Sequence, residues 1–191
     1  MTLSNIVRTA FLGGALAFGG CAAERAASVR ELHQQGRPYS ITEVLQAYHG
    51  EILPLYRSDD PEVQFMNFTN NREGIFRLME TYLSEIDEQT VSSATPEQKQ
   101  ALSVAYSDYS VAIVMGNGRE NISEALPIME RAIELDSHNP AFYYQYAQLL
   151  VNTGRFSDAL RALDSCVALE PSNQMVRGDR ERLEQYIRDH P

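Results

Sequence analysis

The chain has 191 residues, and its 26 Asp and Glu outnumber its 16 Lys and Arg to give a formal net charge of −10. Hydrophobic residues make up 43% of the sequence, a share that is typical of a folded globular protein and not of a disordered one. Because a strongly acidic surface repels phosphate backbones, we expect no nucleic-acid partner.

Residues 1–20 have the features of a targeting segment and not of a folded domain. Arg8 is their only charged residue, and an apolar run, AFLGGALAFGG, follows it at residues 10–20. A helix needs about 20 apolar residues to span a bilayer, so this run is too short to do so. It has the length of the hydrophobic core of a signal peptide, and small residues close it. We therefore interpret residues 1–20 as a signal peptide.

The run ends in FGGC, and this tetrapeptide resembles the lipobox of bacterial lipoproteins. The resemblance implies that residues 1–20 are removed and that Cys21 carries fatty acids such as palmitate. It implies a lipid-anchored protein of the bacterial cell envelope, attached to the membrane through residues 21–37 as an acylated tether. Ala22, and not Asp, follows the cysteine, which resembles lipoproteins sorted to the outer membrane and predicts a protein that faces the periplasm.

Two other interpretations of the N-terminus remain open. Ordinary cleavage after Ala23 would release a soluble periplasmic protein, and an uncleaved segment would remain as an anchor. If Cys21 is acylated, Cys166 is the only cysteine left, and no disulfide can form within the chain. Cys166 lies in an apolar helical pattern, so we expect it to be a small buried residue.

The second half of the chain predicts a pair of helices. The first helix begins at Asn139 and Pro140 and is indicated by the i, i+3, i+4, i+7 spacing of Tyr143, Tyr146, Ala147 and Leu150. Gly154 supplies the left-handed conformation that ends a helix. The second helix begins near Phe156, continues through regularly spaced apolar residues and stops before Pro171.

The pattern of this helix pair resembles the tetratricopeptide repeat, a helical hairpin that stacks into solenoids. The residues that carry the resemblance are Tyr143, Ala147, Gly154, Ala159, Leu163 and Pro171. An earlier, degenerate copy is visible upstream, where the corresponding residues are Tyr106, Tyr109 and Ala125. The resemblance implies an all-α fold: a tetratricopeptide-like solenoid of helical hairpins with two repeats over residues 95–171. We expect residues 172–191 to form a C-terminal capping helix, since the last repeat otherwise leaves its apolar face exposed.

Residues 38–94 are expected to form an N-terminal helical region that stacks on the repeats, because two hairpins alone bury too little apolar surface. Ser40 and Glu43 form a capping box at the start of one helix. The segment Val63–Phe68 could alternate as a short strand. We predict a helix instead, because Asp60 and Pro61 are typical of a helix start.

The sequence contains no constellation that indicates catalysis. Its four histidines are scattered, with no spacing that suits a metal site, and it has no phosphate-binding loop and no nucleophile motif. We therefore expect a protein that is not an enzyme, with no catalytic residue, no cofactor and no metal.

A binding surface is the remaining expectation, because the first helices of stacked hairpins line a concave groove. The side chains that face away from the buried stripes predict a partner-binding groove formed by Ser107, Val111, Val114, Tyr144, Gln145, Gln148, Val151 and Asn152, with Asp108 beside them. Such a groove would suit an apolar or amphipathic segment of a partner. In the alternative interpretation, the N-terminal helices of the same chain fill it.

The function that these features predict is a non-enzymatic scaffold or adaptor lipoprotein that binds another envelope protein through the repeats. The combination resembles lipoproteins that serve outer-membrane assembly, pilus and secretion assembly, or the docking of peptidoglycan enzymes. An alternative is a ligand-binding accessory subunit of a transport system, with a pocket lined by Tyr48, Tyr82, Tyr106 and Tyr109. The same tyrosines are more simply core residues. The sequence leaves the identity of the partner and the oligomeric state open.

Overall fold

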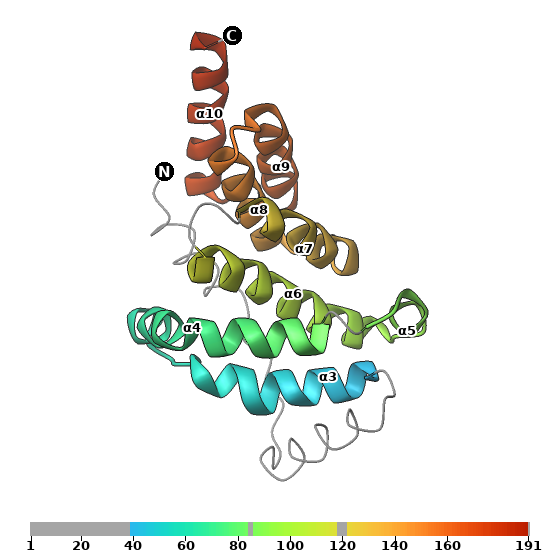
Figure 1. The fold of residues 1–191 in the computed structure, drawn as a ribbon. Helices are drawn as coiled ribbons and strands as arrows, with labels where there is room; N and C mark the ends of the chain where they lie inside the picture. Colours follow the sequence, from blue (N-terminus) through green and yellow to red (C-terminus); the bar gives the residue numbers. More distant parts are fainter. Residues whose placement is uncertain (1–38, 84–85, 118–121, 191) are drawn as a thin grey trace.

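The computed structural model describes residues 39–83, 86–117 and 122–190, and these residues form helices and no strand. The predicted signal peptide, residues 1–20, and the predicted tether, residues 21–37 with Cys21, lie outside the described residues. The helices stack in chain order along the molecule, as Figure 1 shows. The all-α, tetratricopeptide-like helical solenoid that the sequence predicts is therefore confirmed.

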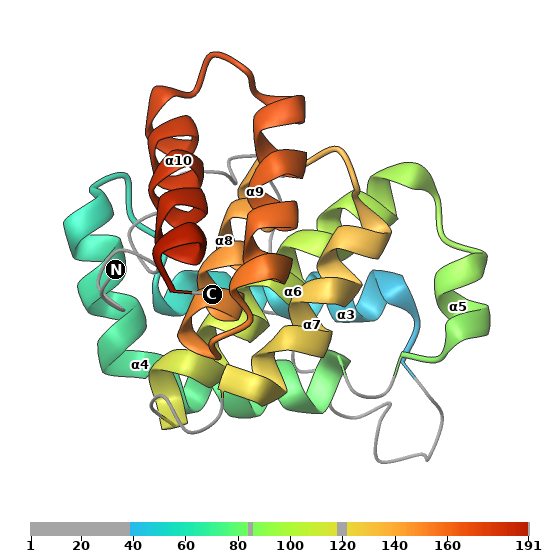
Figure 2. The same cartoon turned by 90° about the horizontal axis from the view of Figure 1, so that it is seen from above.

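Two helical hairpins and a final helix form the C-terminal half. In the first hairpin, α6 (Pro96–Asn117) packs against α7 (Ile122–Leu135). In the second, α8 (Pro140–Asn152) packs against α9 (Phe156–Leu169), and α10 (Gln174–Asp189) covers α9. Figure 2 shows the second hairpin and α10 side by side. Successive hairpins are joined by the contact between α7 and α8.

The N-terminal half contributes a further pair of helical segments. Its first segment runs through α3 (Ile41–Ala47), a π-helical turn, η1 (Tyr48–Ile52), and a 3₁₀ turn, η2 (Leu53–Leu55). The helix changes form here because Pro54 has no N–H to donate and its ring crowds the preceding turn. The second segment is α4 (Pro61–Leu83), and the short helix α5 (Glu88–Ser92) leads from it to α6.

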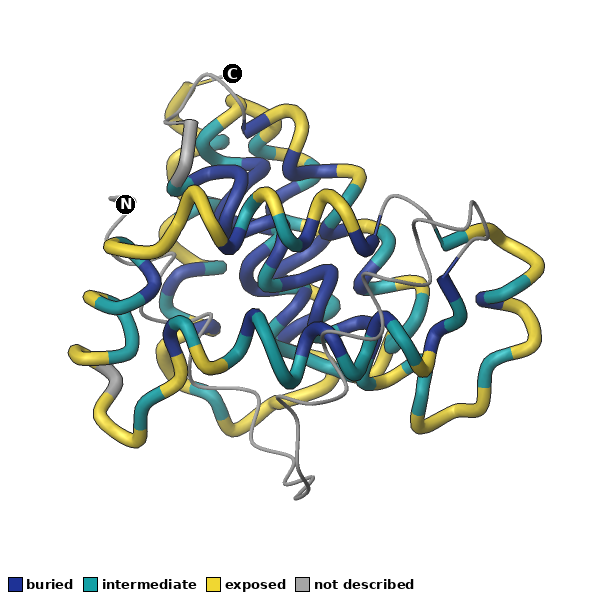
Figure 3. The backbone as a smooth tube through the Cα atoms, turned by 60° about the horizontal axis from the view of Figure 1, so that its bottom comes forward, coloured by how far each residue is buried: buried dark blue, intermediate teal, exposed yellow. Residues whose placement is uncertain are grey.

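The N-terminal helices stack on α6. Both α3 and α4 contact α6, so α6 lies between the N-terminal pair and α7. A single hydrophobic core runs through the stack, from Tyr39 at one end to Val176 at the other. Figure 3 shows the buried backbone concentrated in the middle of the molecule, with exposed segments around it.

Local sequence signals explain where several helices begin and end. The capping box at Ser40 is present, with the Ser40 Oγ accepting from the N–H of Glu43 and the Glu43 carboxylate accepting from the N–H of Ser40. The Asp60 carboxylate accepts from the N–H of Glu62 at 2.9 Å, which starts α4. The segment Val63–Phe68 lies inside α4, so the helix prediction is confirmed and the strand alternative is wrong.

The second repeat hairpin is shaped by small residues and by one glycine. Ala147 on α8 is 1% exposed and Ala159 on α9 is 0% exposed, and their small side chains let the two helices approach closely. Gly154 adopts a φ of 77° in the turn between the helices. Asn139 caps α8, and its side chain accepts from the N–H of Ala141 at 3.1 Å.

The other residues that carry the resemblance to the repeat lie at three levels of burial. Tyr143 is half-buried, and Pro171 is exposed just after α9. The rest are buried in the core: Tyr106, Tyr109, Ala125 and Leu163.

Candidate functional site

The predicted partner-binding groove is not an open surface, and this prediction is wrong. Val151 and Asn152 are half-buried. The other six groove residues are buried, with relative exposures between 2% and 5%: Ser107, Val111, Val114, Tyr144, Gln145 and Gln148. A partner cannot reach buried side chains without unfolding part of the chain.

The chain itself covers these residues. Ser107 on α6 donates a hydrogen bond of 2.7 Å to the amide oxygen of Gln145 on α8. Tyr144 donates a bond of 2.7 Å to the carboxylate of Asp179 on α10, and Arg182 pairs with the other oxygen of that carboxylate. The end helix α10 thus covers part of the face of α8 that the sequence predicted to be open.

The N-terminal helices cover the neighbouring part of α6. The hydroxyl groups of Tyr48 and Tyr56 both donate to one carboxylate oxygen of Asp108, and the two hydroxyls lie 3.1 Å apart. Burial raises the pKa of Asp108 from its ordinary 3.8 to about 6, although hydrogen bonds from the two tyrosines act in the opposite direction. Around Asp108, the N-terminal helices therefore fill the predicted groove, as the alternative interpretation has it.

The four tyrosines of the transport-subunit hypothesis are core residues. Tyr48, Tyr82, Tyr106 and Tyr109 are all less than 9% exposed. The hydroxyl of Tyr82 donates to Glu51 at 2.9 Å, and that of Tyr106 donates to the backbone carbonyl of Leu83 at 3.3 Å. The hydroxyls of Tyr82 and Tyr106 therefore stabilise contacts within the chain.

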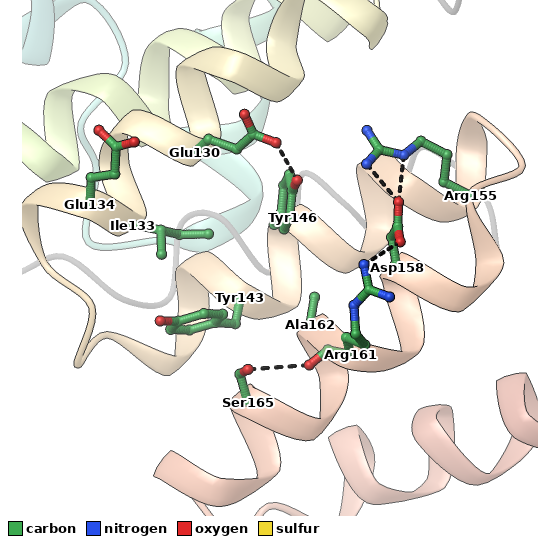
Figure 4. Close-up of a pocket in the computed structure, with 10 residues that line it drawn as sticks. All are labelled: Glu130, Ile133, Glu134, Tyr143, Tyr146, Arg155, Asp158, Arg161, Ala162 and Ser165. Carbon is green, nitrogen blue, oxygen red and sulfur yellow. Dashed lines mark hydrogen bonds and ion pairs between the residues drawn. The ribbon is translucent and has the colours of Figure 1, made fainter.

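A hollow of about 400 Å³ opens on a different surface, between α7, α8 and α9. Tyr143 and Tyr146 of α8 form its base, and Figure 4 shows side chains of α7 and α9 on either side of them. The residues that line it are Glu130, Ile133, Glu134, Tyr143, Tyr146, Arg155, Asp158, Arg161, Ala162 and Ser165. The hollow lies between the second helices of adjacent hairpins.

Tyr146 is fixed across the hollow by Glu130. Its hydroxyl donates to a carboxylate oxygen of Glu130 on α7, and the ring extends from α8 toward that helix. Burial and the hydrogen bond to Glu130 raise the pKa of Tyr146 to about 12, so the hydroxyl remains a donor at neutral pH. This bond ties the two hairpins together at the rim of the hollow.

The opposite wall carries a compact cluster of three charges. Asp158 on α9 pairs with Arg155 at 2.6 Å through one carboxylate oxygen and with Arg161 at 2.6 Å through the other. Arg161 is 76% exposed and Arg155 is 48% exposed, so both extend into solvent. One carboxylate therefore holds two guanidinium groups at the edge of the hollow.

Sequence patterns did not predict this hollow. In the sequence, Tyr143 and Tyr146 stand out only as positions of one amphipathic helix, Tyr143 also as a position of the repeat, and the lining residues of α7 and α9 do not stand out at all. One signal was available, because Tyr146 stands where the repeat usually has Leu, and a tyrosine hydroxyl in that place needs a partner. That Glu130 supplies it depends on how the two hairpins pack, which no local pattern reports.

Three further observations concern metal binding, the free cysteine and membrane insertion. Among residues 39–83, 86–117 and 122–190, no group of three or more His, Cys, Asp or Glu side chains is placed to hold a metal ion. Cys166 is buried, and burial raises the pKa of its thiol to about 11, which disfavours the nucleophilic thiolate. None of the helices in this part of the chain combines the length and apolar character that crossing a bilayer demands.

A comparison with protein families matches residues 118–178 to the tetratricopeptide repeat. The matched range covers all of α7, the second repeat hairpin and the start of α10, and it contains every residue that lines the hollow. A search of curated proteins finds no match to the chain. The match supports a protein–protein interaction module, and proteins built from these repeats are generally non-catalytic interaction scaffolds.

Proposed function

We propose that the protein is a non-enzymatic adaptor of the bacterial cell envelope that binds another protein through its repeat hairpins. The observation that carries the proposal is the hollow between α7, α8 and α9, which lies entirely within the residues that match the tetratricopeptide repeat. Its rim carries exposed charges and its base carries tyrosines, a combination that is common in binding surfaces. The buried groove residues have no part in this proposal.

The envelope location rests on the N-terminal sequence alone. The FGGC sequence that ends at Cys21 supports a lipid anchor, and Ala22 after it supports the outer membrane, with the protein facing the periplasm. An anchor of this kind would confine the hollow to a membrane surface and raise the local concentration of a partner on the same membrane.

Purification of the tagged full-length protein from cells, after mild crosslinking, tests this function. We expect one envelope protein to co-purify in a fixed ratio, and we expect labelled fatty acid on the wild type and none on Cys21→Ala. Purification without any protein in a fixed ratio would contradict the adaptor function. Persistent labelling of Cys21→Ala would contradict the anchor and leave the adaptor function standing.

A further inference from the structure

The base of the hollow offers room for one apolar side chain. Tyr143 and Ile133 are half-buried and lie on α8 and α7, while Ala162 on α9 is 5% exposed. Because Ala162 has only a methyl group, it leaves space between the two tyrosines and α9. A volume of about 400 Å³ is at the lower end of the range for pockets that bind ligands, and it suits a short segment and not a whole helix bundle.

The carboxylate of Glu130 is the one on the rim whose charge is least neutralised. Its hydrogen-bond partner is the neutral hydroxyl of Tyr146, and it forms no ion pair with a cation within the described part of the chain, although Arg155 attracts it from the opposite wall. Glu134, the other acid on this wall, pairs with Arg131 at 2.8 Å. A negative charge next to tyrosine rings is a favourable place for a cation, since the ring faces attract it as well.

The cations on the opposite wall are already engaged. Arg155 and Arg161 share Asp158, with N–O distances of 2.6 Å in both pairs. The hollow as a whole contains three carboxylates and two guanidinium groups, and the chain has a net charge of −10. Asp158 balances only one of these two guanidinium groups, so charge complementarity favours a basic group of the ligand on the wall of Glu130 and not on the wall of Arg155 and Arg161.

We propose that the hollow binds a segment of the partner protein that places an apolar side chain on Tyr143, Ile133 and Ala162 and an adjacent Lys or Arg against Glu130. This inference rests on the proposed adaptor function and adds the chemistry of the partner segment. It also moves the binding surface from the concave face, where the residues are buried, to the side between α7 and α9.

Selection from a phage library of random dodecapeptides on the full-length protein tests the proposal. We expect at least fivefold enrichment, relative to the unselected library, of peptides with Lys or Arg within two positions of a large apolar residue. The variant Glu130→Lys should lose this enrichment. The control Glu181→Lys makes the same charge change at an exposed position on α10, and it should keep the enrichment. No enrichment on the wild type, or the same peptides on Glu130→Lys, would overturn the proposal.

Two further measurements keep the test decisive. If Glu130→Lys disturbs the fold, Glu130→Gln keeps an acceptor for Tyr146 and should still weaken a selected peptide about fivefold. Methyl NMR of the wild type with that peptide should shift the Ile133 and Ala162 signals, and shifts confined to α10 or α4 would contradict the placement. If a partner co-purifies but the selected peptides do not depend on Glu130, the hollow is not the binding site and the adaptor function still stands. If the selected peptides depend on Glu130 but no partner co-purifies, the hollow is a peptide-binding site and the adaptor function is contradicted.

Discussion

The hydroxyl of Tyr144 on α8 donates a hydrogen bond of 2.7 Å to the buried carboxylate of Asp179 on α10. Asp179 is 5% exposed, and burial together with this bond raises the pKa of Tyr144 well above its ordinary value. The bond joins the second repeat hairpin to the last helix and occupies a face that repeat arrays often leave open for a ligand. The C-terminal helix is thus part of the folded core and not a loose appendage.

Replacing Tyr144 by Phe should destabilise the protein by about 1–2 kcal/mol, because the Asp179 carboxylate would lose a buried donor. Urea unfolding followed by circular dichroism would measure the change in the free energy of unfolding. Tyr186→Phe is the matched control, since Tyr186 is 44% exposed on the same end of the molecule and should tolerate the change. Equal stability of Tyr144→Phe and the wild type would show that the bond contributes nothing to folding.

Replacing Ala159 by Arg should destabilise the repeat hairpin by at least about 3 kcal/mol, since the position is 0% exposed and an arginine there is both too large and charged. Ala168→Arg on the same helix is exposed and should change little. The thermal unfolding midpoint compares the two variants. An unchanged midpoint for Ala159→Arg would contradict the close contact between α8 and α9.

Replacing Gly154 by Ala should cost about 1 kcal/mol, because its φ of 77° strains any side chain. A Cβ at this position would meet no atom within 4 Å, so the cost would come from the backbone alone. The control is Gly74→Ala in the interior of α4, which also has open space around it and should stabilise the helix by up to about 1 kcal/mol. Denaturant unfolding should therefore move the two variants in opposite directions.

The stability of the protein should depend on the protonation of Asp108. Its pKa is raised to about 6 in the folded protein from an ordinary 3.8, so between these values the folded state binds a proton that the unfolded state does not. The contribution of this group to stability therefore grows as the pH falls from about 6 to about 4. We expect a gain of about 2 kcal/mol, after allowing for its partial exposure to solvent.

Comparison of the wild type with Asp108→Asn isolates the contribution of this carboxylate, because the variant cannot take up a proton at position 108. The wild type should gain about 2 kcal/mol relative to the variant when urea unfolding is repeated at pH 7.5 and at pH 4.5. A stability difference that stays the same at both pH values would contradict the raised pKa.

Local signals in the sequence predicted much of the fold. The cap at Ser40 follows from a few neighbouring residues, and so does the left-handed turn at Gly154; the structure has both. The burial of the predicted groove residues could not be foreseen in this way, because it depends on elements far away in the chain. Tyr48 lies 60 residues before Asp108, and Tyr144 lies 35 residues before Asp179. Periodicity identifies the face of a helix and does not tell which distant helix covers it.

The hollow could not be predicted from local sequence patterns either, because it forms only where separate hairpins pack together. Tyr143 and Tyr146 were recognised as positions on one helix, yet their place at the base of the hollow requires α7 and α9 on both sides. The contact between Tyr146 and Glu130 joins two hairpins whose relative placement the sequence does not report.

Photocrosslinking in cells from position 161, on the wall of the hollow, tests the adaptor account most directly. The matched position is Gln185, which is exposed on α10 and does not line the hollow. The account predicts one dominant protein adduct from a photoreactive residue at 161, weakened by Glu130→Lys, and no such adduct from position 185. An adduct from position 185 with none from 161, or none from either, would contradict it.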